Sequence, residues 1–345
     1  SNTPHKKGWD SPMLKKLTSL LFVFLTLVAA SASFAGEYPE RNINGYIVWG
    51  AGGVTDNVSR ALASLAEKEL GVSIIMQNKT GASGAIATTY VHNAPADGYS
   101  LLFGAENQGL YKVMNLSQID YDEFIPLLIA MGNTGVVCVS PSSPYATYKD
   151  FIDAAQGEKK FSMGSTGPGG FPYVASCMMT DIHKGIRFNF VQFDGEAGAL
   201  TALMGGHIDA VPVGLLSAAE FIKGNKIRAL AFLADKRLPQ FPDLPAITEF
   251  FPEYERYLPW EAFYGVFIKK GTPDDIVNKL KDAFIKASRN PVFDKLAENL
   301  GGTKLALTGQ DARTYVDKNR SVAAWLMQRA GAAKKSPAEF GIPEP

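Results

Sequence analysis

The sequence is poor in the residues that build disulfide frameworks and metal sites. Its 345 residues include two cysteines, Cys138 and Cys177, and four histidines. Two cysteines could pair in an oxidising compartment, but in a chain of this size they are more often separate buried thiols. The histidines show no metal-ligand spacing. We therefore expect no metal site, and no motif described below indicates a cofactor.

A charge excess of either sign is also missing. The chain has 34 basic and 34 acidic residues, which leaves a formal net charge of zero. A basic stripe would indicate a nucleic-acid surface, and an acidic block would indicate a disordered tail. Neither pattern occurs in the sequence, so we expect no nucleic-acid partner.

Long apolar runs are scarce, and the most marked one lies close to the N-terminus. Lys15 and Lys16 precede an apolar segment at residues 17–30, and small residues lead from there to Ala35. A basic, then apolar, then small-residue pattern is typical of a secretory signal peptide. The apolar segment is shorter than the ~20 residues that a membrane-spanning helix needs. We therefore expect a signal peptide at residues 13–35, cleavage near Ala35, and a periplasmic protein.

The chain beyond this segment is longer than a single hydrophobic core usually grows, so two domains are expected. Short apolar runs alternate with segments of helical period, which indicates an α/β fold. Two strand-like runs, at residues 124–139 and 261–269, are interpreted as crossings between the domains. The predicted organisation is an upstream segment at 1–12, a first domain of residues 36–135 and 261–345, and an inserted second domain of residues 136–260. Two crossings form a hinge that suits closure around a ligand.

The same alternation predicts the individual elements. The strands expected outside the two crossings are 45–49, 72–77, 99–104, 161–165, 187–193, 208–213 and 227–233. The first expected helix is capped by Thr55 or Asp56 and ends at Gly71. The other helices are expected at 83–92, 171–183, 196–204, 217–223, from Thr272 to Asn290, at 291–300 and at 310–330. A hydroxyl at Thr272, proline at the next position and two acids after it are typical of a helix start.

The first candidate site is a glycine-rich loop between a predicted strand and a predicted helix, with the sequence Gly-Ala-Gly-Gly at residues 50–53. Glycines let the backbone approach a ligand, and the start of a helix offers free N–H groups to an anion. A dinucleotide-binding loop would need glycine where Thr55 stands, and a phosphate loop would need Gly-Lys-Ser/Thr at its end. Both fail. The residues expected to bind a small anion are Ala51, Gly52, Gly53, Thr55 and Asp56; the alternative is a glycine-rich turn without a ligand.

Two further loops follow predicted strands. In the loop at residues 165–170, Ser165 and Thr166 have hydroxyls that could donate to a carboxylate, with the backbone of Gly169 and Gly170 behind them. Lysine does not follow Gly169, so this is not a phosphate loop; the alternative is that the hydroxyls only cap the next helix. The loop at residues 104–107 adds weaker candidates, which are Glu106 and Asn107.

Catalytic patterns are missing. The sequence contains no Gly-x-Ser-x-Gly nucleophile elbow. Cys138 lies in an apolar predicted strand, which indicates a core position. Cys177 lies on a predicted helix with no evident base nearby, so a role as nucleophile is not expected. We therefore expect a binding protein and not an enzyme.

Several motifs, each weak alone, occur together in a characteristic order. They are Gly50–Asp56, Asn78–Gly84, Pro95–Leu102, Gly205–Asp209, Lys226–Ala231 and Gly271–Pro273. In this order and spacing the chain resembles the receptors of the tripartite tricarboxylate transporter family, the Bug-type periplasmic solute-binding proteins. The resemblance covers nearly the whole chain beyond the predicted signal peptide.

The resemblance implies a two-domain Venus-flytrap fold, similar to type II periplasmic binding proteins, with two crossover strands as the hinge. It implies capture of a mono-, di- or tricarboxylate chiefly by main-chain amides, hydroxyls and waters, and delivery of the ligand to a membrane permease. It also adds Phe171, Phe193, Asp194 and Ser217 to the expected ligand-binding residues. An alternative function on the same fold is a periplasmic sensing module that reports its ligand to a signalling partner.

The sequence departs from the family pattern at positions that bear on the ligand. Gly170 stands where the family commonly has serine, Tyr173 where histidine is frequent, and Val213 where aspartate is frequent. Phe193-Asp194-Gly195 replaces the usual Tyr-Lys/Arg-Gly, and Phe263 replaces the usual tryptophan. Glu106 lies in a loop that is usually built from small residues. If Glu106 or Asp194 faces the cleft, like-charge repulsion would disfavour a tricarboxylate. An amino acid or another ligand with a cationic group would then fit better. Phe171, Tyr173 and Phe193 could line an apolar pocket or belong to the core.

Overall fold

The computed structural model describes residues 37–345 apart from residues 158 and 301. The predicted upstream segment and signal peptide lie outside the described residues. Residues 41–345 form one compact unit, and all that follows concerns this unit. Within the described part of the chain, no helix is long and apolar enough to cross a membrane.

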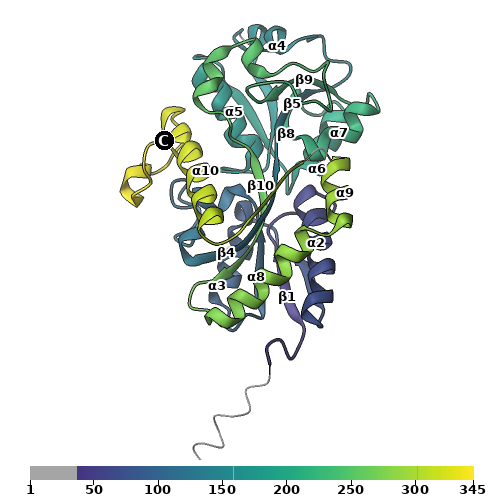
Figure 1. Ribbon diagram of the computed structural model, residues 1–345. Helices are drawn as coiled ribbons and strands as arrows, with labels where there is room; N and C mark the ends of the chain where they lie inside the picture. Colours follow the sequence, from purple (N-terminus) through teal and green to yellow (C-terminus); the bar gives the residue numbers. More distant parts are fainter. Residues whose placement is uncertain (1–36, 158, 301) are drawn as a thin grey trace, which may run out of the picture. The chain divides into compact units, whose positions relative to one another are not determined.

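The first sheet has six strands in the order β11-β4-β10-β3-β1-β2. Figure 1 labels β1, β4 and β10 of this sheet. Its strands are β1 (Ile43–Ile47), β2 (Ile74–Asn78), β3 (Ser100–Gly104), β4 (Phe124–Asn133), β10 (Ala262–Lys269) and β11 (Thr303–Leu307). β1 pairs in parallel with β2 and β3, whereas β10 pairs antiparallel with β3 and β4. The helices that follow these strands are α2 (Val54–Leu70), α3 (Ala85–Asn93), α8 (Asp274–Ser288) and α9 (Pro291–Leu300).

The second sheet has five strands in the order β7-β6-β8-β5-β9. Its strands are β5 (Gly135–Val139), β6 (Phe161–Ser165), β7 (Phe188–Gln192), β8 (Ala210–Gly214) and β9 (Arg228–Leu233). β6 is parallel to β7 and β8, and β5 is antiparallel to β8 and β9. The helices are α4 (Tyr148–Ala155), α5 (Phe171–Ile182), α6 (Glu196–Met204) and α7 (Leu215–Lys223). The predicted α/β class is therefore confirmed.

The chain passes from the first sheet to the second within a single residue. β4 ends at Asn133 and β5 begins at Gly135, so Thr134 alone separates them. The chain returns through a segment of two short 3-10 helices, Ile247–Glu249 and Pro252–Arg256, before β10 begins at Ala262. A movement of one sheet relative to the other would therefore change only a few backbone angles at the β4–β5 junction.

Local sequence explains why α2 forms where it does. Val58, Leu62, Leu65 and Ala66 recur at helical spacing and are buried, and Gly71 ends the helix in the left-handed conformation at a φ of 71°. The predicted cap at Thr55 or Asp56 is wrong, because the N-cap is Gly53 and both residues lie inside the first turn.

A second predicted cap is also wrong. The residue that precedes α8 as its N-cap is Pro273, and the hydroxyl of Thr272 donates to the carbonyl of Lys269 at 2.8 Å. The sequence pattern did place the helix start correctly, because two acids in the first turn favour it. The structure also contains α4 and β11, which the apolar periodicity did not predict.

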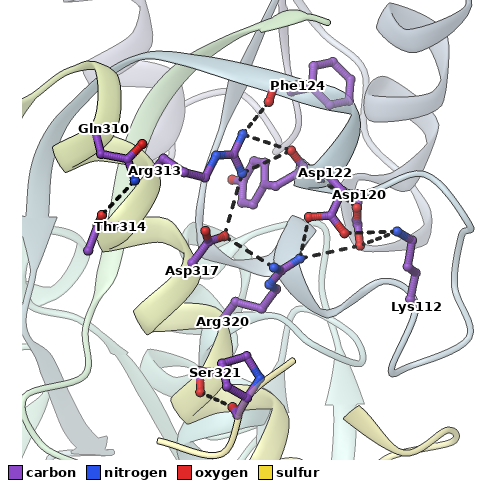
Figure 2. A network of polar contacts seen from close by, with 12 residues as sticks. Lys112, Asp120, Asp122, Phe124, Gln310, Arg313, Thr314, Asp317, Arg320 and Ser321 are labelled. Carbon is purple, nitrogen blue, oxygen red and sulfur yellow. Dashed lines mark hydrogen bonds and ion pairs between the residues drawn. The ribbon is translucent and has the colours of Figure 1, made fainter. Parts of the chain in front are cut away.

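The C-terminal helix α10 (Gly309–Arg329) is tied to the segment that follows β3 by a network of charges (Figure 2). Arg320 Nη1 lies 2.9 Å from Asp122 Oδ1, and Lys112 Nζ lies 3.2 Å from both Asp120 Oδ2 and Asp122 Oδ2. The stem of Arg320 packs on Gly109, in the 3-10 helix η2 (Glu106–Leu110). The network therefore supports the short helix that carries Glu106.

Candidate functional site

A cavity of about 290 Å³ lies where the carboxyl ends of β1, β3, β6 and β7 converge. Ligands of open α/β sheets bind at this edge, because the loops there start helices and expose backbone N–H groups. The lining residues come from both sheets and their loops: Trp49–Ala51, Gly53–Thr55, Ala105, Glu106, Thr166, Phe171, Pro172, Phe193–Gly198, Ala262 and Tyr264.

The structure brings together about half of the residues predicted to bind a ligand. Those that line the cavity are Ala51, Gly53, Thr55, Glu106, Thr166, Phe171, Phe193 and Asp194. Those that lie outside the lining are Gly52, Asp56, Asn107, Ser165, Gly169, Gly170 and Ser217. Ligand contact itself stays a prediction for each of them.

Several residues outside the lining hold the loops that form it. Asp56 accepts from the backbone N–H of Gly52 at 3.0 Å and from Asn78 Nδ2 at 2.9 Å. Ser165 Oγ accepts from the backbone N–H of Gly167 at 3.1 Å. Asn107 Nδ2 donates to the carbonyl oxygen of Ser83. Sequence reasoning placed these side chains in the right loops but could not show that they point into the protein.

A steric restriction explains why a glycine occupies position 170. A Cβ added there would lie 2.1 Å from Thr166 Oγ1, so the threonine hydroxyl already fills the space of a side chain. The same hydroxyl belongs to a residue of the cavity lining. The side chain of Thr166 therefore limits which residue fits at the position of Gly170.

Glu106 is the most deeply buried acid of the lining. Its residue surface is 6% exposed, and it begins η2 directly after β3 and Ala105. Burial raises the pKa of its carboxyl to about 8, the negative charge of Glu196 adds to this, and nearby backbone groups, including those of Phe171 and Phe263, oppose it. Phe171 is the first residue of α5, so the carboxylate lies at the start of a helix that belongs to the second sheet.

Glu196 is a lining residue that the sequence did not single out as part of the site. It is the first residue of α6, its Oε1 accepts from the backbone N–H of Gly214 at 3.1 Å, and its Oε2 accepts from the hydroxyl of Ser217. Burial raises the pKa of the carboxyl to about 7, against the effect of these two hydrogen bonds. Its position beside the unusual Phe193-Asp194-Gly195 segment was the signal that could have identified it.

The lining is acidic without a balancing cation. It contains Glu106, Asp194 and Glu196, and no lysine, arginine or histidine belongs to it among the residues that the structure describes. Asp194 is exposed, and its carbonyl oxygen accepts from the backbone N–H of Gly50 at 3.4 Å. This hydrogen bond joins the loop after β1 to the loop after β7 at the cavity.

Three helix starts on the cavity have no side-chain cap. They are the starts of α2 at Gly53, of α5 at Gly170 and of α6 at Gly195, and none of these N-cap residues supplies a side-chain acceptor. The first N–H groups of a helix carry partial positive charge and favour an anion. The cavity is therefore bordered by helix starts from the elements of both sheets.

Aromatic rings form the apolar part of the cavity. Trp49, Phe171, Phe193 and Tyr264 belong to the lining. Phe171 stacks on Trp260 with a centroid distance of 5.1 Å and an interplanar angle of 1°. Tyr173 does not line the cavity, because its ring packs against Phe190 at a centroid distance of 4.7 Å.

Neither a metal cluster nor a reactive thiol emerges from the described residues. Residues 37–345, with the gaps at 158 and 301, contain no group of three His, Cys, Asp or Glu side chains that could hold a metal ion. Cys138 in β5 and Cys177 in α5 are unpaired and buried, and burial raises the pKa of the Cys177 thiol to about 12. Both cysteines are thus neutral core thiols at physiological pH.

The sequence profile of the tripartite tricarboxylate transporter family receptors matches residues 58–331. The chain belongs to this family. A UPF0065 protein of Bordetella pertussis is 27% identical to this chain over 310 residues, which cover 88% of the chain and 94% of the relative. The predicted family is therefore confirmed.

Solved structures show that the chain has the fold expected for this family. The periplasmic binding protein BugD is 26% identical and superposes with a TM-score of 0.80, covering 86% of this chain and all (100%) of BugD. A protein of R. palustris solved with adipate is 23% identical, with a TM-score of 0.78 over 86% of this chain and 99% of that protein. The second likeness concerns the fold alone. The predicted two-domain α/β periplasmic-binding fold is confirmed.

Proposed function

We propose that this protein is a periplasmic receptor that captures a small carboxylate-containing ligand in the cavity and delivers it to the membrane permease of a tripartite transporter. The observation that carries this proposal is that two uncapped helix starts, α2 at Gly53 and α6 at Gly195, border the same cavity. A carboxylate between them would accept backbone hydrogen bonds without a fixed cation. Membership of a transporter receptor family supports the same class of function.

The arrangement also supports closure around the ligand. Residues 36–135 and 261–345 would form one domain and residues 136–260 the other, joined at Thr134 and ahead of Ala262. The backbone hydrogen bond between Gly50 and Asp194 shows that loops of the two proposed domains meet at the cavity. A ligand held by both loops would stabilise the closed form, because binding favours the conformation in which more contacts are made. The permease would then recognise that form.

Binding without chemistry is the proposed mode of action. The cavity contains acids, aromatic rings, backbone amides and the hydroxyls of Thr55, Thr166 and Tyr264. Among the described residues, neither threonine hydroxyl is hydrogen-bonded to Glu106 or Glu196, and Glu196 instead accepts from Gly214 and Ser217. A hydroxyl without a neighbouring base is a poor nucleophile. Residues 13–35 would direct the chain to the periplasm and be removed there.

The experiment that tests the proposal is thermal unfolding of the purified protein without its signal peptide, against a panel of carboxylates, sugars and metal ions. A ligand that binds the native state alone raises stability by about 2.7 kcal/mol at a hundredfold excess over Kd. A rise in Tm with carboxylate-containing compounds is expected. Shifts from sugars or metals, with none from any carboxylate-containing compound, would contradict the proposal.

A further inference from the structure

The buried acid Glu106 has no counter-ion in the part of the chain that the structure describes. It is more than nine-tenths buried, it lines the cavity, and no described lysine, arginine or histidine forms an ion pair with it. A buried charge without a partner is costly, so a carboxyl in this position either keeps its proton or acquires a cation. The cation would have to come from the ligand, because the described lining supplies none.

Glu196 is a second acid of the cavity lining, it is partly buried, and no described lysine, arginine or histidine forms an ion pair with it. Its carboxylate accepts hydrogen bonds from Gly214 and Ser217, at the start of α7. Its negative charge also raises the pKa of Glu106, so the two side chains are close enough to repel each other. Glu106 and Glu196, which follow strands of different sheets, therefore line the same cavity.

These acids occupy helix starts that a ligand carboxylate would otherwise use. The carboxylate of Glu106 lies at the start of α5, and that of Glu196 lies at the start of α7. A second or third carboxylate on a ligand would meet both of these negative charges. The uncapped starts of α2 and α6 remain available to one carboxylate.

We propose that Glu106 and Glu196 together form a subsite for a cationic nitrogen, so that the ligand is a small amino-carboxylate whose carboxylate binds at the starts of α2 and α6. This inference rests on the proposed function, since it specifies the ligand of the same cavity. The rings of Trp49, Phe193 and Tyr264 in the lining suit a cationic group, because aromatic faces attract cations.

Binding of such a ligand is linked to protons. A cationic nitrogen binds the ionised glutamates and displaces protons from them, whereas a dicarboxylate favours the protonated forms and takes up protons. The other titratable groups that act on these two acids are Tyr111, Tyr121, Tyr264, Tyr315 and Cys138, and each has a pKa raised above its ordinary value, mainly by burial. They stay neutral near physiological pH, so the linkage belongs to Glu106 and Glu196.

The test compares ligands that differ only in the amino group. Isothermal titration of the signal-peptide-free protein would use 5-aminopentanoate, pentanoate and glutarate, and each of the common α-amino acids with its deaminated acid. We expect the amino member of at least one set to bind about tenfold tighter or more than its partners. In two buffers of different ionisation enthalpy near neutral pH, its binding should release protons.

Variants separate the subsite from the rest of the cavity. Glu106→Gln and Glu196→Gln should each lose most of the preference for the amino member. Glu261→Gln is the matched control: Glu261 is also partly buried with a raised pKa, but it bonds to Tyr315 and lies outside the lining, so this variant should keep the preference. If a glutamine variant does not fold, the proton release of the unaltered protein still decides the question.

The outcomes distinguish the inference from the proposed function. Equal or tighter binding of the deaminated acids, or proton uptake on binding of the amino member, would overturn the cationic subsite and leave the carboxylate receptor standing. Binding of diamines with no amino-carboxylate bound would overturn the assigned ligand class and the proposed function. No response to any carboxylate-containing compound would overturn both.

Discussion

Ser217 Oγ donates a hydrogen bond to Glu196 Oε2, and this contact joins the first turn of α7 to the first residue of α6. The backbone N–H of Gly214 donates to the other oxygen of the same carboxylate at 3.1 Å. Ser217 therefore orients an acid that lines the cavity, and its own contact with the ligand stays a prediction.

Replacing Ser217 by alanine removes one of the two groups that stabilise the ionised carboxylate. We expect Ser217→Ala to lower the free energy of unfolding by about 1–2 kcal/mol near pH 8, because a hydrogen bond to a charged acceptor is lost. The loss should be smaller near pH 5, where more of the Glu196 carboxyl is protonated. Urea unfolding at both pH values measures it. The exposed Ser142→Ala serves as control, and an equal loss at both pH values would contradict the mechanism.

Glu106 should make stability depend on pH. Its folded pKa of about 8 lies above the ordinary value of 4.5, so the unfolded chain releases this proton first. The stabilising effect of the bound proton is full below about pH 4.5 and is lost as pH rises toward 8. Glu196, with a pKa of about 7, acts in the same direction.

Glu106→Gln removes the larger of these two contributions. We expect the variant to gain stability relative to the unaltered protein as pH rises from about 5 to 8, by on the order of 2–4 kcal/mol. Chemical denaturation across that range gives the slope directly. Glu220→Gln, at an exposed position, should leave the slope unchanged. A parallel pair of curves for Glu106→Gln and the unaltered protein would show that Glu106 is ionised throughout.

The Thr166–Gly170 pair should behave non-additively. Gly170→Ser restores the residue common in the family but brings a Cβ against Thr166 Oγ1, so we expect a loss of about 1–3 kcal/mol. Thr166→Ala removes the hydroxyl and should make Gly170→Ser nearly neutral. A double-mutant cycle by thermal unfolding measures the coupling. Additive losses would mean that the backbone of the loop relaxes to accept the serine.

Arg320 should control the order of the helix that carries Glu106. Arg320→Met keeps the apolar stem but removes the ion pairs with Asp122 and Asp317, at 2.9 and 3.3 Å. Because the arginine side chain is largely buried, we expect a loss of about 1–3 kcal/mol and faster amide exchange across residues 106–110. Arg41→Met, which removes an exposed ion pair to Asp97, is the control and should cost less than about 1 kcal/mol. Unchanged exchange in η2 would contradict the supporting role of the network.

Much of the fold was predictable because its signals are local. The strand at Phe161–Ser165 and the helix at Glu196–Met204 have the predicted bounds, and Gly71 ends α2 as expected. The two wrong caps share a cause: a side chain near a helix start can bond elsewhere, as Thr272 does to Lys269, and sequence alone does not fix its rotamer. Strand β11 was missed because it is short, none of its five residues is fully buried, and its apolar residues occupy only the last three positions.

The sequence by itself determined the family, the α/β class and the glycine-rich loops at the ends of strands, since each follows from residue order and short-range periodicity. Only the tertiary structure decided which loop residues meet. Glu106 and Glu196 are 90 positions apart in the chain, and their electrostatic coupling arises because the ends of β3 and β7, in different sheets, open onto one cavity. Long-range contacts of this kind depend on how the two sheets pack, and no local pattern encodes them.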